Sequence, residues 1–254
     1  MPATQEDELA VIVYAPSLAG DAARSLSVIH AMERACPGLR LEWQVSDEGQ
    51  LLPVGPHDAW VAKGRADGPG FSMLCNGDEH QPITIAGWDR PAGVPAGRQP
   101  QFEVHAALPL DKEGGVDAER VLESIADAAH AFWGHATPFL SGLDIARQTR
   151  NGRTDSAAPP RGLPALRPPR DIHSPEIPHR LGWVNFWSEA TVHALGFPDP
   201  FRDAELLSRS RRTARGGWIV RLSSNPLDLD DSVHLDALVR TYERFPWIGG
   251  RSSP

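Results

Sequence analysis

Proline is concentrated in the middle of this 254-residue chain, and that concentration constrains the fold more than any other feature. The stretch SAAPPRGLPALRPPRDIHSPEIP holds seven of the 24 prolines, at positions 159, 160, 164, 168, 169, 175 and 178. Proline lacks a backbone N–H and clashes with the preceding helical turn, which excludes this stretch from helix interiors and central strands. We therefore expect three parts: residues 1–150, a proline-rich connector at 151–179 that runs over the surface, and residues 180–254.

The first part contains short apolar segments separated by glycine and proline, several of them with the two-residue period of a half-buried strand. The segments expected to be strands are 9–15, 39–45, 58–64, 70–76, 82–88 and 101–109. Apolar residues at helical spacing predict one helix between Asp21 and Pro37. They predict a second helix over 116–137, with Asp117 as its cap. This order predicts an α+β fold, a largely antiparallel meander with helices packed on one face.

The last part is expected to add a helix–helix–strand–helix segment packed on the same domain. Apolar residues at helical spacing predict helices at 184–195 and 199–212, the first ended by Gly196 and the second begun by Pro200. A strand is expected at 216–223, and a final helix at 231–245.

Motifs that would identify an enzyme are absent from the sequence. It contains no phosphate-binding loop, no dinucleotide fingerprint and no nucleophile elbow, so we expect no cofactor. Cys36 and Cys75 form no CxxC pair and are expected to be buried apolar side chains. The histidine pairs 173/179 and 130/135 lack metal-ligand spacing, so we expect no metal site.

The charge of the chain indicates which partners to expect. A net charge of −8 does not attract nucleic acid or an anionic membrane, although it could attract a basic protein or simply keep the chain soluble. A nucleic-acid reading of Arg209, Arg211, Arg212 and Arg215 conflicts with this charge. The acidic N-terminus, and the lack of any apolar run as long as a membrane span, favour a cytoplasmic protein.

Two groups of residues are candidates for a site. Asp228, Asp230 and Asp231 could cap the last helix, form an acidic patch for a partner, or assist catalysis with a metal. Among the eight tryptophans, Trp183 and Trp187 are four residues apart and would share one face of the expected helix. Tryptophan is favoured both in cores and as an interface anchor.

The C-terminal motifs carry a resemblance to a known family. GWVNFWS (182–188), ALGFPDP (194–200), GGWIVRLS (216–223) and the PLDLDD turn resemble the immunity protein 52 family of bacterial polymorphic toxin systems, and also a related uncharacterised family. The family has an α+β fold with recurrent tryptophans, and the positions here that fit that description are Trp183, Trp187 and Trp218.

The resemblance implies a function. Members protect the producing cell by binding a toxin encoded beside them, often a nuclease with a restriction-endonuclease-like fold, and need no catalytic residue of their own. The expected partner is thus a basic cognate toxin, bound at Asp228, Asp230 and Asp231, with Trp183, Trp187 and Trp218 as further candidates. Two alternatives remain: an accessory or regulatory protein-binding module, and an enzyme that uses Asp228 and Asp230 with a histidine.

Overall fold

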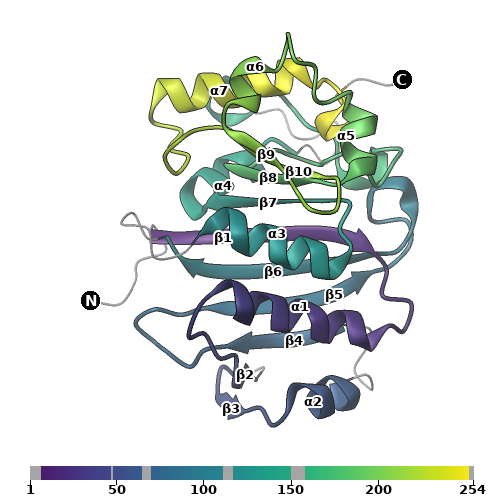
Figure 1. The fold of residues 1–254 in the computed structure, drawn as a ribbon, viewed down its shortest axis with the longest axis vertical. Coiled ribbons are helices and arrows are strands. Elements are labelled where there is room, and N and C mark those ends of the chain that lie inside the picture. Colours follow the sequence, from purple (N-terminus) through teal and green to yellow (C-terminus); the bar gives the residue numbers. More distant parts are fainter. Residues whose placement is uncertain (1–6, 47, 65–69, 111–116, 150–157, 252–254) are drawn as a thin grey trace.

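A single antiparallel sheet of ten strands organises the computed structural model, which describes residues 7–46, 48–64, 70–110, 117–149 and 158–251 (Figure 1). The strand order is β3-β2-β4-β5-β6-β1-β7-β8-β10-β9. The strands are β1 (Glu8–Pro16), β2 (Trp43–Val45), β3 (Leu51–Pro53), β4 (Gly70–Cys75), β5 (Thr84–Arg90), β6 (Gln101–Pro109), β7 (Trp133–Pro138), β8 (Val184–Trp187), β9 (Ser210–Arg212) and β10 (Trp218–Arg221).

Seven α-helices and four short 3₁₀ helices accompany the strands within the described ranges. The α-helices are α1 (Ala22–Ala35), α2 (His57–Gly64), α3 (Ala118–Ala129), α4 (Phe139–Ala146), α5 (Glu189–Leu195), α6 (Ala204–Leu207) and α7 (Ser232–Arg244). The 3₁₀ helices are η3 (Ala96–Arg98), η4 (Pro160–Gly162), η5 (Pro169–Asp171) and η6 (Ile248–Gly250). Over these ranges no helix combines the length and apolar character that crossing a membrane requires.

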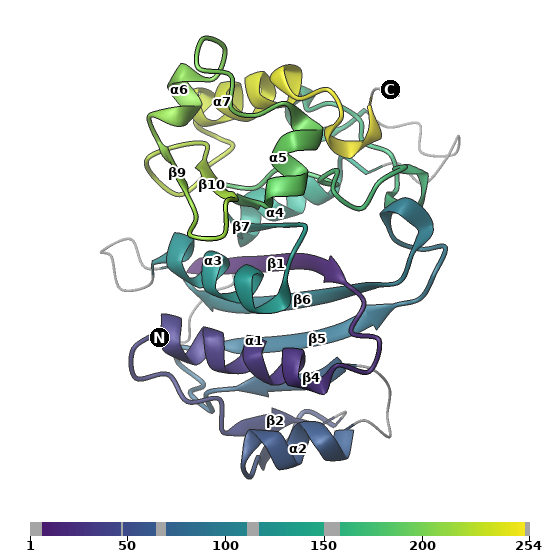
Figure 2. The same ribbon diagram turned by 45° about the vertical axis from the view of Figure 1, so that its right-hand side comes forward.

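The N-terminal strand lies at the centre of the sheet, and its alternating sequence gives the sheet two different faces. Leu9, Val11, Val13 and Ala15 are buried toward α1 and α3, which lie side by side across one face in both ribbon views (Figures 1 and 2). We call this layer the first core. The α+β architecture with an antiparallel sheet is therefore confirmed, although α1 and α3 are not the only helices packed on the sheet.

The opposite face of the sheet carries a second core. Ile12 and Tyr14 of β1 belong to it, together with buried side chains of β7, β8, β10, α5 and α7. The proline-rich segment contributes Leu163, Leu166, Ile172 and Ile177, which are all at most 4% exposed. Its described part, from residue 158 onward, is therefore packed into the core rather than running over the surface, while residues 151–157 lie outside the described ranges.

The expected helix at 184–195 is wrong in its first part. Val184–Trp187 is strand β8, and the helix α5 begins only after Ser188, whose hydroxyl accepts a hydrogen bond from Thr191 N at 3.2 Å. Strand β8 lies between β7 and β10 and is buried on both faces, so its residues show no two-residue period. A short run of this kind cannot be distinguished from a helix by periodicity. Gly196 does end α5, with a φ of 64°.

The helix expected over 116–137 is shorter, because His130 ends α3 in the left-handed conformation, with a φ of 57°. The chain then returns to the sheet: Phe132 N donates to Tyr14 O at 2.9 Å, and β7 pairs with the open side of β1. Residues 58–64, expected as a strand, lie in α2, which is preceded by Pro56.

The expected helix at 199–212 is also wrong for most of its length. Only Ala204–Leu207 is α-helical, and Ser210–Arg212 forms β9, which pairs with β10 in a hairpin. Asp203 precedes α6 with its carboxylate turned inward, where Arg244 of α7 donates to it at 2.6 Å. Tertiary partners, rather than local propensity, therefore decide the structure of this segment.

Candidate partner-binding surface

The acidic turn Asp228–Asp231 leads into α7, and its three aspartates are exposed while Leu229 is buried. Asp231 caps the helix, since its carboxylate accepts a hydrogen bond from Val233 N at 2.8 Å. Asp228 holds the turn by accepting from Asp230 N at 2.9 Å. The capping role expected for this cluster is thus confirmed for Asp231, and all three carboxylates still lie at the surface.

Arg161 of the proline-rich segment joins this turn to α4. Its guanidinium donates to the carboxylates of Asp230 and Asp144, each at 2.7 Å, and to the backbone oxygen of Leu229 at 3.0 Å. A second link comes from Ser141, whose hydroxyl donates to Leu227 O at 2.6 Å. The helix α4 and the acidic turn therefore lie side by side, although they are far apart in the sequence.

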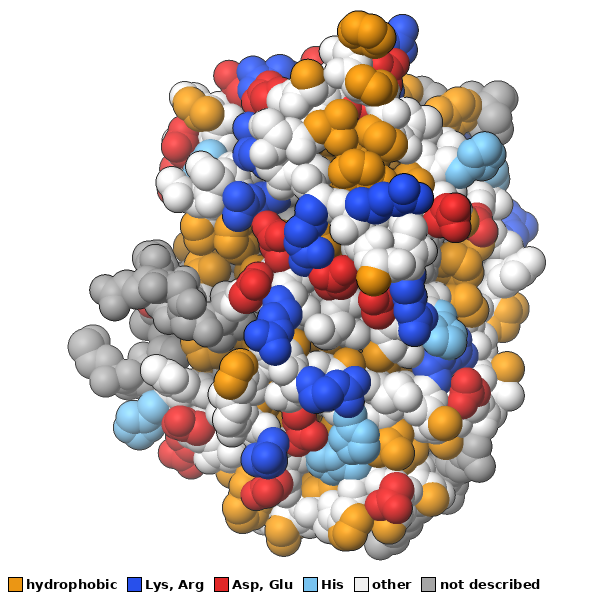
Figure 3. Space-filling model, in the orientation of Figure 1, with side chains coloured by type: hydrophobic (Ala, Val, Ile, Leu, Met, Phe, Trp, Pro, Cys, Tyr) orange, Lys and Arg blue, Asp and Glu red, His pale blue; other side chains and the backbone are white. Residues whose placement is uncertain are grey.

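The outer side of α4 is apolar. Leu140 and Leu143 are 51% and 40% exposed, and Val233 at the start of α7 is 66% exposed. In the space-filling view, hydrophobic side chains gather over α4 (Figure 3). We use the name acidic–apolar surface for the patch formed by Leu140, Leu143, Asp144, Asp228, Asp230, Asp231 and Val233. It combines apolar area with four carboxylates, which are balanced in part by Arg161 and by Arg147, 3.1 Å from Asp144.

The three candidate tryptophans lie mainly in the core. Trp187 is 0% exposed, so its side chain offers no surface to a partner. Trp183 is half-buried and donates from Nε1 to Ser223 O at 3.0 Å. Trp218 is also half-buried and packs edge-on against Phe197, with 5.3 Å between ring centroids. They do not share a helix face, because Trp187 and Trp218 lie on strands and Trp183 directly precedes one.

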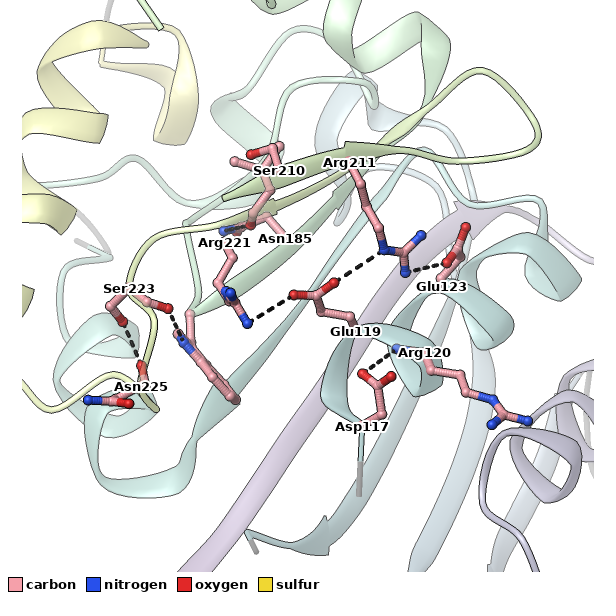
Figure 4. A network of polar contacts seen from close by, with 12 residues as sticks. Asp117, Glu119, Arg120, Glu123, Asn185, Ser210, Arg211, Arg221, Ser223 and Asn225 are labelled. Carbon is pink, nitrogen blue, oxygen red and sulfur yellow. Dashed lines mark hydrogen bonds and ion pairs between the residues drawn. The ribbon is translucent and has the colours of Figure 1, made fainter. Parts of the chain in front are cut away.

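A network of charged side chains ties the hairpin of β9 and β10 to α3 (Figure 4). Arg211 donates to Glu119 at 3.2 Å and to Glu123 at 2.6 Å, and Arg221 lies 3.3 Å from Glu119. The hydrogen bond to Glu123 raises the pKa of Arg211. Within the arginine cluster considered for nucleic-acid binding, Arg209 also pairs with a carboxylate, that of Glu205 at 3.2 Å. These contacts offset much of the positive charge of the cluster.

A group of buried rings lies on the second-core side of the sheet. Tyr14 stacks on Trp133 with 4.2 Å between ring centroids, and His179 contacts both rings at 4.8 Å. His135 of β7 is hydrogen-bonded to Thr137 Oγ1 at 3.0 Å. Burial, reinforced by the charge of Arg180, lowers the pKa of His135 and of His179 to about 3. Both imidazoles are therefore neutral at pH 7.

In each of the histidine pairs 173/179 and 130/135, one member is exposed and the other is buried. His173 is exposed while His179 is buried, and His130 is exposed at the end of α3 while His135 is buried on β7. The expectation that His130 and His135 share a helix was wrong, because the chain enters the sheet between them.

The carboxylates of the turn lie at the surface. The Asp230 side chain is 81% exposed and is paired with Arg161. The neighbouring histidine, His234, accepts at Nδ1 from Asp228 N at 3.1 Å, and its Nε2 lies 4.0 Å from the carboxylate of Asp231. This arrangement fixes the turn and the helix start, and it holds the carboxylates outward.

The family of the chain is given by a match over residues 20–253, to the family described as "Domain of unknown function (DUF5953)". The chain belongs to the DUF5953 family. The resemblance of the C-terminal motifs to the immunity protein 52 family and to a related uncharacterised family is compatible with this match, which does not specify either. No curated protein matches the chain.

The DUF5953 protein is similar in fold to a solved structure titled "Pseudomonas aeruginosa T6SS protein PA0821". The TM-score is 0.55 at 13% sequence identity, and the match covers 94% of this chain and 76% of the other. At this identity the likeness shows the fold alone. It extends over nearly the whole chain.

Local sequence pattern did not predict α4 as part of the acidic–apolar surface. The run FLSGLDIA follows a strand that was itself expected to be helical. Leu140 and Leu143 flank the inward-facing Ser141, which with Ile145 is buried. A helical wheel drawn from Phe139 would have separated these two sides, but only with the start of the helix already known.

Proposed function

We propose that this DUF5953 protein is an immunity protein that binds a cognate toxin, a basic nuclease domain, and neutralises it stoichiometrically through the acidic–apolar surface. The observation that carries the proposal is the exposure of Leu140, Leu143 and Val233 next to the carboxylates of the turn. A surface of this composition suits a partner that presents apolar side chains within a basic groove. The resemblance of the C-terminal motifs to immunity protein 52 and the T6SS-related fold neighbour support the same reading.

The protein acts in this proposal by occupying the toxin, without a catalytic residue of its own. Asp228 and Asp230 supply negative charge where a nuclease would bind phosphates, and the leucines of α4 supply apolar contact area. Because α4 is joined to the turn through Arg161, both parts are held in fixed relative positions before binding. Such preorganisation reduces the entropy lost on association.

The test is co-expression with the product of the adjacent gene. We expect the neighbour to arrest growth when expressed alone and to be harmless when the DUF5953 protein is present. The purified pair should form a 1:1 complex whose affinity falls steeply as salt rises. A neighbour that is harmless alone, or equally toxic with this protein present, contradicts the proposal.

Surface variants test the location. Asp228→Lys with Asp230→Lys, and separately Leu143→Asp, should abolish protection while leaving the protein folded. Glu79→Lys is the matched control, because Glu79 is equally an exposed acid but lies in the turn between β4 and β5. Protection that survives both surface variants would move the interface elsewhere. Complex formation without loss of toxicity would favour an accessory role instead.

A further inference from the structure

We propose that His30, Glu33 and His57 form a binding site for a zinc-class divalent transition-metal ion between α1 and α2. In the part of the chain that the structure describes, they are the one group of three potential ligand residues whose ligand atoms all lie within 4.8 Å of one another. In the space-filling view, histidine side chains gather at the surface between these two helices (Figure 3). The site is separate from the acidic–apolar surface and does not depend on the proposed partner.

The two helices bring the ligands together in a simple way. His30 and Glu33 are three residues apart on α1, a spacing that places both side chains on the same face. His57 is the first residue of α2 and approaches that face from the neighbouring helix. The rings of His30 and His57 lie 5.6 Å apart between centroids. Two imidazoles and one carboxylate are a recurrent ligand set for zinc, with a further position left for water.

The backbone of Leu41 orients two of the three ligands. Leu41 N donates to Glu33 Oε1 at 3.0 Å, and Leu41 O lies 3.0 Å from His57 Nε2. A carbonyl oxygen can only accept, so Nε2 of His57 carries a proton, and in the neutral imidazole that would bind a metal Nδ1 carries the lone pair. Metal-binding histidines typically donate their second nitrogen to a backbone carbonyl in this way, which fixes the ring and its tautomer.

The two atoms of His57 and Glu33 that do not bond to Leu41 face one another. His57 Nδ1 lies 4.0 Å from Glu33 Oε2, and the Glu33 and His57 side chains are each only 13% exposed. A lone pair held close to a carboxylate in a mostly buried position favours a cation between them. Zinc–nitrogen and zinc–oxygen bonds of about 2.0–2.2 Å place tetrahedral ligand atoms about 3.3 Å apart. The separations between the three ligand atoms, which are within 4.8 Å here, must therefore shrink by about 1.5 Å at most, through rotations of the two histidine side chains.

The ligand types select the metal. Imidazole nitrogen suits zinc, copper and nickel, whereas magnesium and calcium prefer an all-oxygen set. An ion at this position would connect α1 to α2 directly and, through Leu41, to the segment that leads into β2. Since metal binding to the folded state stabilises that state, the ion should raise the unfolding temperature of the protein.

The experiment uses the full chain, stripped with a chelator and titrated with Zn²⁺ in competition with a chromophoric chelator. We expect one Zn²⁺ per chain, an unfolding temperature that rises with Zn²⁺ but not with Mg²⁺, and visible absorption from Co²⁺ in tetrahedral coordination. His30→Gln and Glu33→Gln should each weaken Zn²⁺ binding at least about tenfold. Glu33→Gln retains an oxygen that can accept from Leu41 N, so the local fold is preserved.

Two controls keep the inference open to contradiction. His193→Gln removes an exposed histidine of α5 and should leave Zn²⁺ binding unchanged. The unfolding temperature of each metal-free variant separates loss of metal from loss of fold. Equal Zn²⁺ affinity in wild type and in both ligand variants would overturn the site. Absence of Zn²⁺ binding in the wild type would also overturn it.

Discussion

Trp187 and Trp218 lie directly opposite each other on the antiparallel strands β8 and β10, and the ring of Phe197 packs edge-on against both. On the other side of β8, Trp187 is opposite Trp133 of β7. One row of tryptophans thus crosses three neighbouring strands on the second-core side of the sheet. This arrangement explains why tryptophans recur in the C-terminal motifs: Trp187 and Trp218 belong to the second core, in which α5 and α7 also pack.

We expect Trp187→Ala to lower the free energy of unfolding by about 3–5 kcal/mol, because it removes a fully buried indole from a closed environment. Trp187→Phe should cost less, since most of the ring volume remains. Denaturant titration measures both values. Phe201→Ala is the control: its side chain is 96% exposed, so the free energy of unfolding should change by no more than about 0.5 kcal/mol.

Substitutions at Asp231 can separate capping from charge. Asp231→Ala should lower the free energy of unfolding by about 1 kcal/mol, since Val233 N loses its hydrogen-bond acceptor. Asp231→Asn keeps an oxygen at the cap but removes the charge, so stability should be nearly unchanged while affinity for a basic partner falls. Denaturant titration and binding measurements on the same two proteins provide the comparison. Equal partner binding by wild type and Asp231→Asn would remove this carboxylate from the interface.

The stability of the protein should fall as the medium becomes acidic. The pKa of buried His135 and His179 is about 3, below the ordinary value of 6.5, so between these values the unfolded chain binds more protons than the folded chain. The free energy of unfolding should therefore decrease by up to about 4 kcal/mol from pH 7.5 to pH 5. Denaturant midpoints measured across that range test the slope.

Glu103 adds to this effect only at lower pH. Burial by itself raises its pKa, but hydrogen bonds from His105 and Arg90 outweigh burial and lower the pKa to about 2, from 4.5. Its contribution is consequently lost as pH falls from about 4.5 toward 2.

Removing one buried histidine with His179→Gln should reduce the slope between pH 6.5 and pH 5, whereas His193→Gln, at an exposed position, should not. A slope that is the same in His179→Gln and wild type would contradict the assignment.

The contact between Arg211 and Glu123 should contribute little to stability. The Arg211 side chain is 45% exposed and that of Glu123 is 20% exposed, so solvent screens their attraction. A double-mutant cycle with Arg211→Ala and Glu123→Ala should give a coupling energy below about 1 kcal/mol that decreases in high salt. A large, salt-independent value would show that the pair is shielded from water. Because Glu119 contacts both Arg211 and Arg221, Glu119→Ala should cost more than Glu123→Ala.

Much of the first half of the fold follows from local pattern. The alternation over 101–109 coincides with β6, and the helix after Asp117 begins where the capping residue predicts, with Asp117 accepting from Arg120 N. Errors occur where a segment is buried on both sides or ends early. Residues 133–138 and 184–187 are buried on both faces because sheet neighbours and two cores surround them, so their sequences show neither a helix nor a strand period.

The candidate surface could be predicted only in part. The acidic turn was recognised as a cap and as a possible interface edge, because its carboxylates are adjacent in the sequence. The contribution of α4 required the hydrogen bonds of Arg161 to Asp144 and Asp230, which join residues separated by 17 and 69 positions. Similarly, His30, Glu33 and His57 are brought together by the packing of α1 against α2 and by the Leu41 backbone, which no local spacing reveals.

The sequence by itself determined the α+β class, the acidic character, the helix caps at Asp21, Asp117 and Asp231, and the exclusion of the described part of the proline-rich stretch from α-helices and strands. These properties depend on side-chain chemistry and on backbone preferences over a few residues. Tertiary structure alone decided that β1 lies between β6 and β7 and that side chains of the proline-rich stretch are buried in the second core. It also decided that Trp133, Trp187 and Trp218 pack in that core. The physical reason is that burial, strand pairing and buried charge depend on neighbours distant in the chain, and these interactions override weak local preferences.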